Sequence, residues 1–345
     1  MEEYPVDIVF GWCDSSDPVF AARRAKALGR EAAPRTGSEK LRHAAHDELK
    51  YAIRSVERNA PWIRSIIVAV DDCQTVPDWV TEGHPKVRIV RHREFIPEEY
   101  LPSFNSLVIE FYLHRIPGLS EHYLYGNDDQ LLYQPIELSD CFAEDGFPYV
   151  RFGGGIFRLK DSIYTRIFDN ACALLRTRFP DRGALAKAMR HGSHHNIDAY
   201  RRSDVEAFSR DFAKEIAEHS QYRFRDGRQL DHAMILAYAL AIGHAHYRAA
   251  FSKIARKLSH TFLRPLLGDW CESGVIQSNT DLAAELKRRG HPKFLCFNDA
   301  FGTTPEQYRA MKEFMEIVFP EGAEDGTPVY ARVNDRDPPP ACGGV

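Results

Sequence analysis

The fold is decided by residues 6–18, which read Val-Asp-Ile-Val-Phe-Gly-Trp-Cys-Asp-Ser-Ser-Asp-Pro. The apolar run at 6–13 predicts a buried β-strand, because short apolar runs bounded by turn residues are typical of the interior of a sheet. Apolar runs at 65–70, 87–91 and 122–126 predict three further strands. The sheet is therefore expected to begin within the first residues of the chain.

Helical patterns separate these strands. Residues 47–59 place apolar side chains at the 3-4-7 spacing of one helix face, and Pro61 ends the helix. Residues 103–115 are also predicted to be helical, with Pro117 and Gly118 as the stop signal. Strands that alternate with helices are joined by right-handed crossovers, which place helices on both faces of the sheet. The predicted fold class is α/β with a largely parallel sheet.

The pattern changes after Pro148. A strand or hairpin is predicted at 149–160, around a glycine triplet, and residues 161–243 are mostly helical in pattern. The later predicted elements are a helix at 281–289, a strand at 294–297 and a helix at 305–318.

The chain of 345 residues is long enough for one large domain or two. We predict a single catalytic domain over residues 1–333 and a loose tail at 334–345. Within the domain, the α/β core spans 1–160 and about 290–320, and a mainly helical insertion occupies about 161–289.

Composition excludes several classes of protein. The chain has 44% hydrophobic and 27% charged residues, which are ordinary globular values. Its 45 Lys and Arg against 49 Asp and Glu give a net charge of −4, which argues against nonspecific nucleic-acid binding. The 7 cysteines are scattered and include no Cys-x-x-Cys pair, so neither a disulfide framework nor a zinc module is expected.

No targeting or membrane-spanning segment is predicted. Residues 1–9 lack the basic start of a signal peptide, and the longest apolar run, 233–243, is far shorter than the ~20 residues of a membrane span. We expect a cytoplasmic protein, and a peripheral association with the inner face of the membrane or oligomer formation stays open.

Carboxylates follow three of the predicted strands, and this is the main functional signal. Asp14 and Asp17 follow the first strand, Asp71 and Asp72 the second, and residues 127–129 (Asn-Asp-Asp) the fourth. Ligands of open α/β sheets bind at this edge, although Asp and Asn after a strand can equally cap helices or form turns. Clustered carboxylates repel one another unless a cation neutralises them, which favours Mg²⁺ or Mn²⁺ shared with substrate phosphates. A nucleotide sugar is a suitable donor for such a site.

These residues resemble the Stealth family. Residues 7–18 resemble its first conserved region, and the second region is matched at 47–63, 101–106, 114–120 and 125–129. A weaker likeness to the third region covers His195, residues 200–202 and 222–225, and residues 294–299 resemble the fourth. Gly126 stands where the family usually has Phe, and Ile197 takes the place of the Pro in its His-x-Pro.

The resemblance implies a nucleotide-sugar-transferase core of the GT-A-like or Rossmann-like type. It also implies that a hexose or hexosamine 1-phosphate passes from a nucleotide sugar, with a UDP-sugar favoured, to a hydroxyl of a glycan. The product is a phosphodiester in capsular or cell-surface polysaccharide. Two alternatives stay open: an ordinary nucleotide-sugar glycosyltransferase, and a catalytically inactive relative that binds carbohydrate or nucleotide.

Three residues are the candidates for catalysis. Asp129 is expected to bind metal or activate the acceptor, with Asp128 in support, because successive residues leave a strand in opposite directions. His195 is the candidate general base, with His194 as the alternative, because an imidazole accepts a proton near neutral pH. Arg225 is expected to hold phosphate oxygens with its guanidinium group.

Other residues are candidates for binding the donor. The candidate substrate-binding residues are Trp12, Asp14, Asp17, Asp71, Asn105, Asn127, Arg151 and Arg223, and the candidate metal ligands are Asp128, Asp129, Asn298 and Asp299. Structural roles compete with several of them. Trp12 fits a core position, Asp17 a turn with Pro18, Asn105 a helix cap, and Asn298 a turn after a strand.

Overall fold

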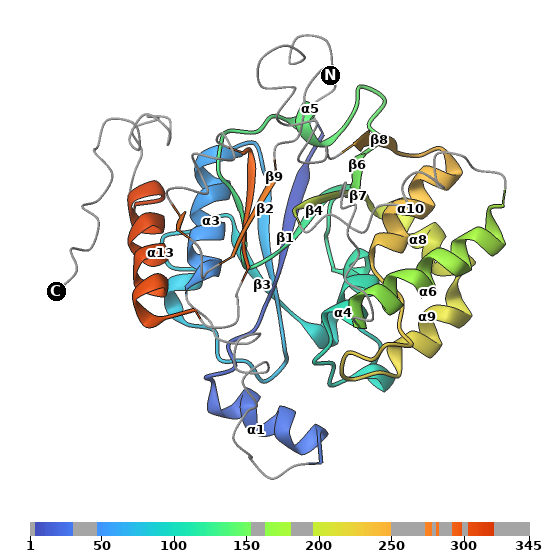
Figure 1. Cartoon of the computed structure of the whole chain (residues 1–345), viewed down its shortest axis with the longest axis horizontal. Helices are drawn as coiled ribbons and strands as arrows, with labels where there is room; N and C mark the ends of the chain where they lie inside the picture. The colour runs from blue at the N-terminus through green and yellow to red at the C-terminus, as the bar shows by residue number, and fades with distance from the viewer. Residues whose placement is uncertain are drawn as a thin grey trace.

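The main sheet of the protein has five strands in the order β3-β2-β1-β4-β7. A computed structural model describes residues 4–29, 47–152, 163–180, 196–249, 273–277, 281–282, 292–298 and 303–320. The strands of this sheet are β1 (Val6–Trp12), β2 (Ser65–Val70), β3 (Val87–Arg91), β4 (His122–Asn127) and β7 (Asp198–Arg201). The first four are parallel and β7 is antiparallel to β4, which confirms the predicted α/β fold with a largely parallel sheet (Figure 1).

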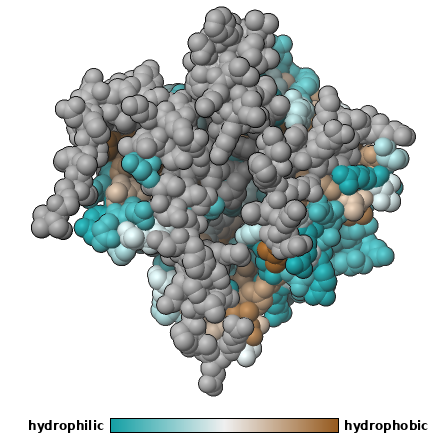
Figure 2. All heavy atoms as spheres, in the orientation of Figure 1, coloured by the Kyte–Doolittle hydropathy of each residue, from teal (hydrophilic) through white to brown (hydrophobic). Residues whose placement is uncertain are grey.

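Helices cover both faces of this sheet (Figure 1). The helices on one side are α3 (Glu48–Asn59) and α13 (Pro305–Val318), and those on the other are α4 (Ser106–Tyr112), α6 (Ile163–Arg178), α8 (Arg202–Asp211), α9 (Ala213–Ser220) and α10 (Ala233–Ile242). The alternation of strand β1 explains the two layers: Ile8 and Phe10 pack into the core on the α3 side, and Val9 packs on the α4 side. Figure 2 shows mostly hydrophilic residues where the described helices of the second side reach the surface.

Smaller elements complete the described structure. Two further sheets consist of β5 (Gln130–Leu132), β10 (Phe294–Asn298) and β9 (Ser273–Gln277), and of β6 (Tyr149–Phe152) and β8 (His246–Ala249). The remaining helical segments are α1 (Pro18–Ala27), α5 (Leu138–Cys141), η1 (Asp78–Val80), η2 (His92–Glu94), η3 (Glu98–Tyr100) and η4 (Leu113–Arg115). Since β10 pairs with β5, the late strand is placed beside the turn that follows β4.

The helix predicted at 103–115 is shorter in the structure. It begins at Ser106 and ends in the 3-10 turn η4, because Asn105 and the residue before it bond elsewhere. The Asn105 amide donates to the carbonyl of Tyr222 at 2.9 Å, and the Phe104 N–H donates to the carbonyl of Arg223 at 3.0 Å. Asn105 occupies the N-cap position of α4, as the helix-cap interpretation predicts, but its side chain makes no cap bond.

Three strands lie inside the region predicted as a mainly helical insertion. They are β7, β8 and β9, of which β7 and β8 have only 4 residues each. Strands this short contain too few alternating apolar and polar residues to be predicted from the sequence. Strand β7 forms by pairing with the edge of β4. Most of the helix predicted at 281–289 and all of the tail at 334–345 lie outside the described residues.

Gly126 and Ile197, which both depart from the family pattern, lie next to each other. A Cβ atom at Gly126 would lie 2.9 Å from Cγ1 of Ile197, which is closer than real Cβ atoms approach, and 3.1 Å from Oε1 of Gln130, which is tighter than most real Cβ contacts. Ile197 is 2% exposed, so it has little room to move away. The small residue at 126 therefore makes the space that the branched side chain at 197 fills.

We expect Gly126→Ala to destabilise the fold by about 1–3 kcal/mol through overpacking, and Ile197→Ala by about 2–5 kcal/mol through a cavity. The double variant should cost less than the sum, because the added methyl group enters the space that Ile197 vacates. Urea unfolding measures the free energy of unfolding of each single variant and of the double variant. Ile167→Ala on α6 is the control, and its cost should add to that of Gly126→Ala; additivity of the 126 and 197 variants would contradict the contact.

Candidate active site

The carboxyl ends of β1, β2 and β4 meet at one edge of the sheet, because these strands are parallel and paired in register. Asp14 lies just beyond β1, Asp71 follows β2, and Asp128 follows β4. Burial, followed by the charges of Asp128, Asp14 and Asp71, raises the pKa of the Cys13 thiol to about 12. The structure therefore places the three carboxylate segments at one edge of the sheet, as the sequence predicts.

Asp128 and Asp129 occupy a turn between β4 and β5. The strand alternation used to separate their roles therefore does not apply to them, because both residues lie in a turn. The backbone carbonyl of Asp129 accepts the N–H of Phe297 at 2.9 Å, and its Oδ2 accepts the thiol of Cys296 at 3.4 Å. These contacts hold Asp129 against β10, whose last residue is Asn298.

Negative charge is concentrated at this turn. Burial raises the pKa of Asp128 well above its usual value, and the neighbouring charges of Asp129 and Glu48 raise it further. The same negative charges act on Cys296. Burial and the charges of Asp129 and Asp128 raise the pKa of its thiol well above the ordinary value. An ionised pair here is unfavourable unless positive charge approaches it.

Asp71 and Asp14 are bound differently. Oδ1 of Asp71 accepts a hydrogen bond from Nη1 of Arg23 at 2.6 Å and another from the N–H of Cys73 at 2.9 Å. Its buried Oδ2 has no hydrogen-bond partner in the described part of the chain. Oδ1 of Asp14 accepts only a local bond from the N–H of Ser16 at 2.8 Å among the described contacts. Both residues thus offer carboxylate oxygens to this edge.

Asp17 caps helix α1. Its Oδ1 accepts from the N–H groups of Val19 and Phe20 at 2.8 and 3.3 Å, and its Oδ2 accepts from the N–H of Thr75 at 2.5 Å and from Gln74 at 3.1 Å. Burial raises the pKa of Asp17, but the hydrogen bonds from Thr75, Val19 and Phe20 outweigh it and lower the pKa. Its carboxylate is occupied by the fold, as the turn interpretation predicts.

The predicted arginines of the later half lie beside α4. Nη1 of Arg225 donates to the hydroxyl of Tyr164 at 2.7 Å, and Nη2 donates to the hydroxyl of Ser106 at 2.8 Å. Arg223 lies in the same loop and is exposed, and its carbonyl is held by Phe104. Helix α4 therefore sets the position of the Arg225 guanidinium and of the Arg223 backbone.

A buried acid–base cluster connects this loop to the carboxylate edge, and sequence reasoning missed it. Nδ1 of His232 lies 3.0 Å from Oε2 of Glu110, and Nε2 lies 4.0 Å from Oδ2 of Asp198. The hydroxyl of Tyr125 donates to Oε1 of Glu110 at 3.1 Å and lies 3.1 Å from Oδ1 of Asn127. The one signal in the sequence is Glu110 itself, a charge within the apolar helix α4.

The cluster is ionised. Burial lowers the pKa of His232, but Glu110, Asp231 and Asp198 outweigh burial and raise it to about 10. Burial raises the pKa of Glu110, but His232 and Arg225 outweigh burial and lower it. Arg225 thus acts electrostatically on a carboxylate that is hydrogen-bonded, through Tyr125, to the end of β4.

Other predicted residues lie apart from this edge or outside the described residues. Arg151 is 4% exposed, donates to the carbonyl of Asp140, and places its guanidinium 5.2 Å from the ring centre of Phe294. Trp12 is 7% exposed and packs in the core on the α3 side, as its core interpretation predicts. His195, His194 and Asp299 lie outside the described residues.

The donor set can be tested against a divalent metal. No group of three or more His, Cys, Asp or Glu with metal-binding geometry occurs among the described residues, and Asp299 is not one of them. The chemistry of Asp128 and Asp129 nevertheless fits, because adjacent carboxylates supply the oxygen ligands of Mg²⁺ and Mn²⁺. The pKa of Asp128 is raised partly by the negative charges around it, and a bound cation would offset those charges.

Three curated relatives are similar to nearly all of the chain. Exopolysaccharide phosphotransferase SCO6021 of Streptomyces coelicolor is 36% identical over 326 residues, 92% of this chain and 55% of the relative. Exopolysaccharide phosphotransferase CpsY of Mycobacterium tuberculosis is 31% identical over 332 residues, 92% of this chain and 57% of the relative. An exopolysaccharide phosphotransferase of Nocardia farcinica is 38% identical over 333 residues, 93% of this chain and 60% of the relative. The chain thus spans little more than half the length of these relatives.

Solved structures with a similar arrangement include the galactosyltransferase LgtC with donor and acceptor sugar analogs, at 11% identity and a TM-score of 0.42 over 90% of this chain and 95% of that one. The bifunctional glycosyltransferase WbbM gives 12% identity and a TM-score of 0.42 over 96% of this chain and 52% of that one. None of the helices in the described part of the chain is long and apolar enough to cross a lipid bilayer. Residues 42–150 match the family model of Stealth protein CR2, conserved region 2, so this part of the chain carries the conserved region 2 of the Stealth proteins.

Proposed function

We propose that this chain is a sugar-1-phosphate transferase. It would move a hexose or hexosamine 1-phosphate from a nucleotide sugar to a glycan hydroxyl, forming a phosphodiester in capsular or cell-surface polysaccharide. The observation that carries the proposal is the meeting of the Asp14, Asp71 and Asp128 segments at the carboxyl edge of a parallel sheet. The naming of the relatives as exopolysaccharide phosphotransferases supports the same chemistry.

A divalent cation belongs to this proposal. Asp128 and Asp129 would hold Mg²⁺ or Mn²⁺, with Asn298 and Asp299 from the end of β10 completing the ligands. The bonds from Asp129 to Cys296 and Phe297 bring Asn298 to the same turn, which supports this set. When bound, the cation would neutralise charge on the diphosphate of the donor.

The remaining steps fall to side chains of this chain. Arg225 and Arg223 would bind phosphate oxygens and orient the donor, while Asn127 and Asp14 would contact its nucleotide part. The acceptor hydroxyl forms a bond to the β-phosphorus, and the bond from that phosphorus to the bridging oxygen breaks. The nucleoside monophosphate leaves with the electron pair, and His195 takes the proton of the hydroxyl. The bond between the sugar C1 and its oxygen stays intact, so the anomeric configuration is kept.

The test is a panel of nucleotide sugars with a glycan acceptor and Mg²⁺, read by phosphorus NMR. We expect one phosphodiester in the glycan for each nucleoside monophosphate released. A glycosidic product with release of nucleoside diphosphate would instead identify an ordinary glycosyltransferase. Donor binding without turnover would identify a catalytically inactive relative.

Metal binding can be checked without activity. The raised pKa of Asp128 means that the folded state holds its proton to higher pH than the unfolded state, so this group lowers stability as pH rises above about 4. We expect Mg²⁺ or Mn²⁺ to oppose this loss. At a concentration about 100 times its Kd, the cation adds about 2.7 kcal/mol to the free energy of unfolding.

The measurement is the Tm at pH 7.5 with and without the cation, reversed by EDTA. Asp128→Asn should abolish the shift, while Asp78→Asn, an exposed aspartate in η1, should keep it. An equal shift in wild type and Asp128→Asn would show that the cation binds elsewhere.

A further inference from the structure

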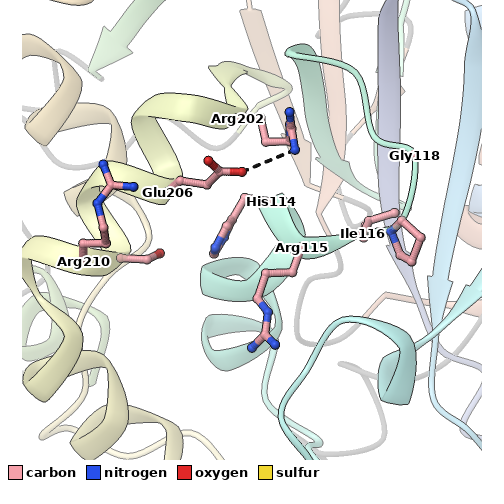
Figure 3. A pocket seen from close by; sticks show the side chains of 9 residues that line it. His114, Arg115, Ile116, Gly118, Arg202, Glu206 and Arg210 are labelled. Atoms are coloured by element: carbon pink, nitrogen blue, oxygen red, sulfur yellow. Dashed lines mark ion pairs between the residues drawn. The ribbon is translucent and has the colours of Figure 1, made fainter.

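A pocket lies at the opposite, amino end of the sheet from the carboxylates. It has a volume of about 530 Å³ and lies between the end of α4, the residues that lead into β4, and helix α8 (Figure 3). The side chains that matter here are His114, Arg115, Arg202, Glu206, Ser209 and Arg210. The backbone N–H of Arg202 donates to the carbonyl of Glu121 at 2.7 Å, which fixes the start of α8 beside the start of β4.

The pocket carries excess positive charge. Arg115, Arg202 and Arg210 line it together with a single carboxylate, Glu206. Nη1 of Arg202 lies 3.3 Å from Oε1 of Glu206, and this ion pair leaves the charges of Arg115 and Arg210 uncompensated within the lining (Figure 3). Guanidinium groups bind phosphate and carboxylate oxygens through paired N–H donors.

Buried polar atoms without partners also face the pocket. His114 is only 8% exposed, and its ring points into the space between η4 and α8 (Figure 3). Nδ1 of His114, Oγ of Ser209 and Nε of Arg202 are buried without a hydrogen-bond partner in the part of the chain that the structure describes. A buried polar group without a hydrogen bond is costly, so a ligand that supplies acceptors gains most at the hydroxyl of Ser209, while Nε of Arg202 already lies 4.0 Å from Oε2 of Glu121.

His114 is neutral in this pocket. Burial, followed by the charge of Arg115, lowers its pKa to about 4, although a hydrogen bond with the Phe111 backbone opposes this shift. A neutral imidazole adds nothing to the repulsion among the three arginines. The ligand that fits this lining is an oxyanion with several acceptor oxygens.

We propose that this pocket binds a phosphate group of the phosphodiester-linked glycan, away from the place of transfer. The inference rests on the proposed function for the identity of the glycan. Arg202 of the pocket follows Arg201, which pairs with His122 at the start of β4. Asn127 ends that strand, so the two sites are about 16 Å apart along the strand direction. An acidic glycan with several sugars can reach from one site to the other.

A membrane surface fits the pocket less well. The exposed large hydrophobic residues among those described are Val19, Tyr164 and Ile317, and none of them lines the pocket. Proteins that lie on a bilayer combine basic residues with exposed apolar side chains. A concave site with buried donors is suited to one discrete group instead.

The test is titration calorimetry with a synthetic pair of sugars joined by a phosphodiester, and with the same glycan lacking the phosphate. Arg115→Gln/Arg210→Gln removes two exposed cations of the pocket, so the fold should be unaffected. We expect its Kd for the phosphodiester glycan to rise at least about 10-fold, since two charge-assisted contacts are lost. Lys214→Gln/Arg309→Gln removes two exposed cations from α9 and α13 and should bind like wild type. The glycan without phosphate should show no binding that depends on these arginines.

Activity separates the two proposals. In the Arg115→Gln/Arg210→Gln variant, we expect an unphosphorylated acceptor to react as in wild type and the KM for a phosphate-bearing acceptor to rise. If binding of the phosphodiester glycan is unchanged in this variant while transfer continues, the pocket assignment is wrong and the proposed function stands. If binding weakens as expected but no transfer occurs with any donor, the pocket stands and the proposed function is wrong.

Two further probes test the source of the phosphate. Inorganic phosphate that binds the pocket as tightly as the glycan would overturn the glycan assignment. Phosphatidylglycerol vesicles that bind through Arg115 and Arg210 when the glycan does not would identify a membrane site instead.

Discussion

Asp129→Asn is expected to lower the transfer rate by at least about 10³-fold, the scale of losing a positioned acid–base group or charge at a reacting centre. The substitution keeps the size of the side chain but removes its negative charge. Asp129 lies in the turn after β4, is anchored to β10 through Phe297 and Cys296, and raises the pKa of Asp128. Its charge is therefore the property that the site depends on. The measurement is kcat with saturating donor, acceptor and Mg²⁺.

The control must separate lost chemistry from lost folding. Without Mg²⁺, Asp129→Asn should be no less stable than wild type, because removing its charge relieves the repulsion that raises the pKa of Asp128. The stabilisation by Mg²⁺ should be lost along with activity. Asp78→Asn, an exposed change of the same kind, should keep both. A wild-type rate in Asp129→Asn would refute the assignment of this residue.

The position of the carboxylate edge could be predicted because it depends on local patterns. The bounds predicted for the strands at 65–70 and 87–91 and for the helix at 305–318 agree with the structure. Apolar runs and flanking prolines mark these bounds directly in the sequence. Once these strands are parallel, the residues that follow β1, β2 and β4 must share an edge.

What each carboxylate does there could not be predicted, because it depends on distant partners. Asp17 is occupied by Thr75 and Gln74, which lie 58 and 57 residues away in sequence. The side chain of Asn105 is bonded to Gln229 across 124 residues instead of to the start of its own helix. Sequence patterns are recognised over windows of up to about 18 residues, and a window of that length around either side chain does not include these partners.

The departures from the family pattern at Gly126 and Ile197 show a different limit. Each departure looks like a weakened motif when it is considered alone. The space at Gly126 and the side chain of Ile197 are complementary only in three dimensions, where the added Cβ would lie 2.9 Å from Cγ1. The two changes are therefore one packing solution, which a single sequence cannot reveal.

His232→Gln is expected to destabilise the fold by about 3 kcal/mol near pH 6.5, because it removes the cation from a buried cluster of carboxylates. Glu110 is 6% exposed and Asp198 is 4% exposed, so neither is well placed to recover hydration. His244→Gln is the matched control. Its Nδ1 also lies close to a carboxylate, 2.6 Å from Oδ1 of Asp204, but the His244 side chain is 44% exposed, so we expect a loss of at most about 1 kcal/mol.

The pH dependence gives the prediction its sign. The pKa of His232 is raised from an unfolded value near 6.5 to about 10, so its contribution is complete below about pH 6.5 and is lost as pH rises through about 10. The pKa of Glu110 is lowered, so its contribution is present above about pH 4.5 and is lost at lower pH. The cost of His232→Gln should therefore be greatest between these limits and shrink on both sides in urea unfolding. Adding Glu110→Gln should restore part of the stability, since it removes one of the carboxylates left without a cation. A cost equal to that of His244→Gln at every pH would contradict an ionised cluster, and with it the electrostatic link from Arg225 through Glu110 and Tyr125 to the carboxylate edge.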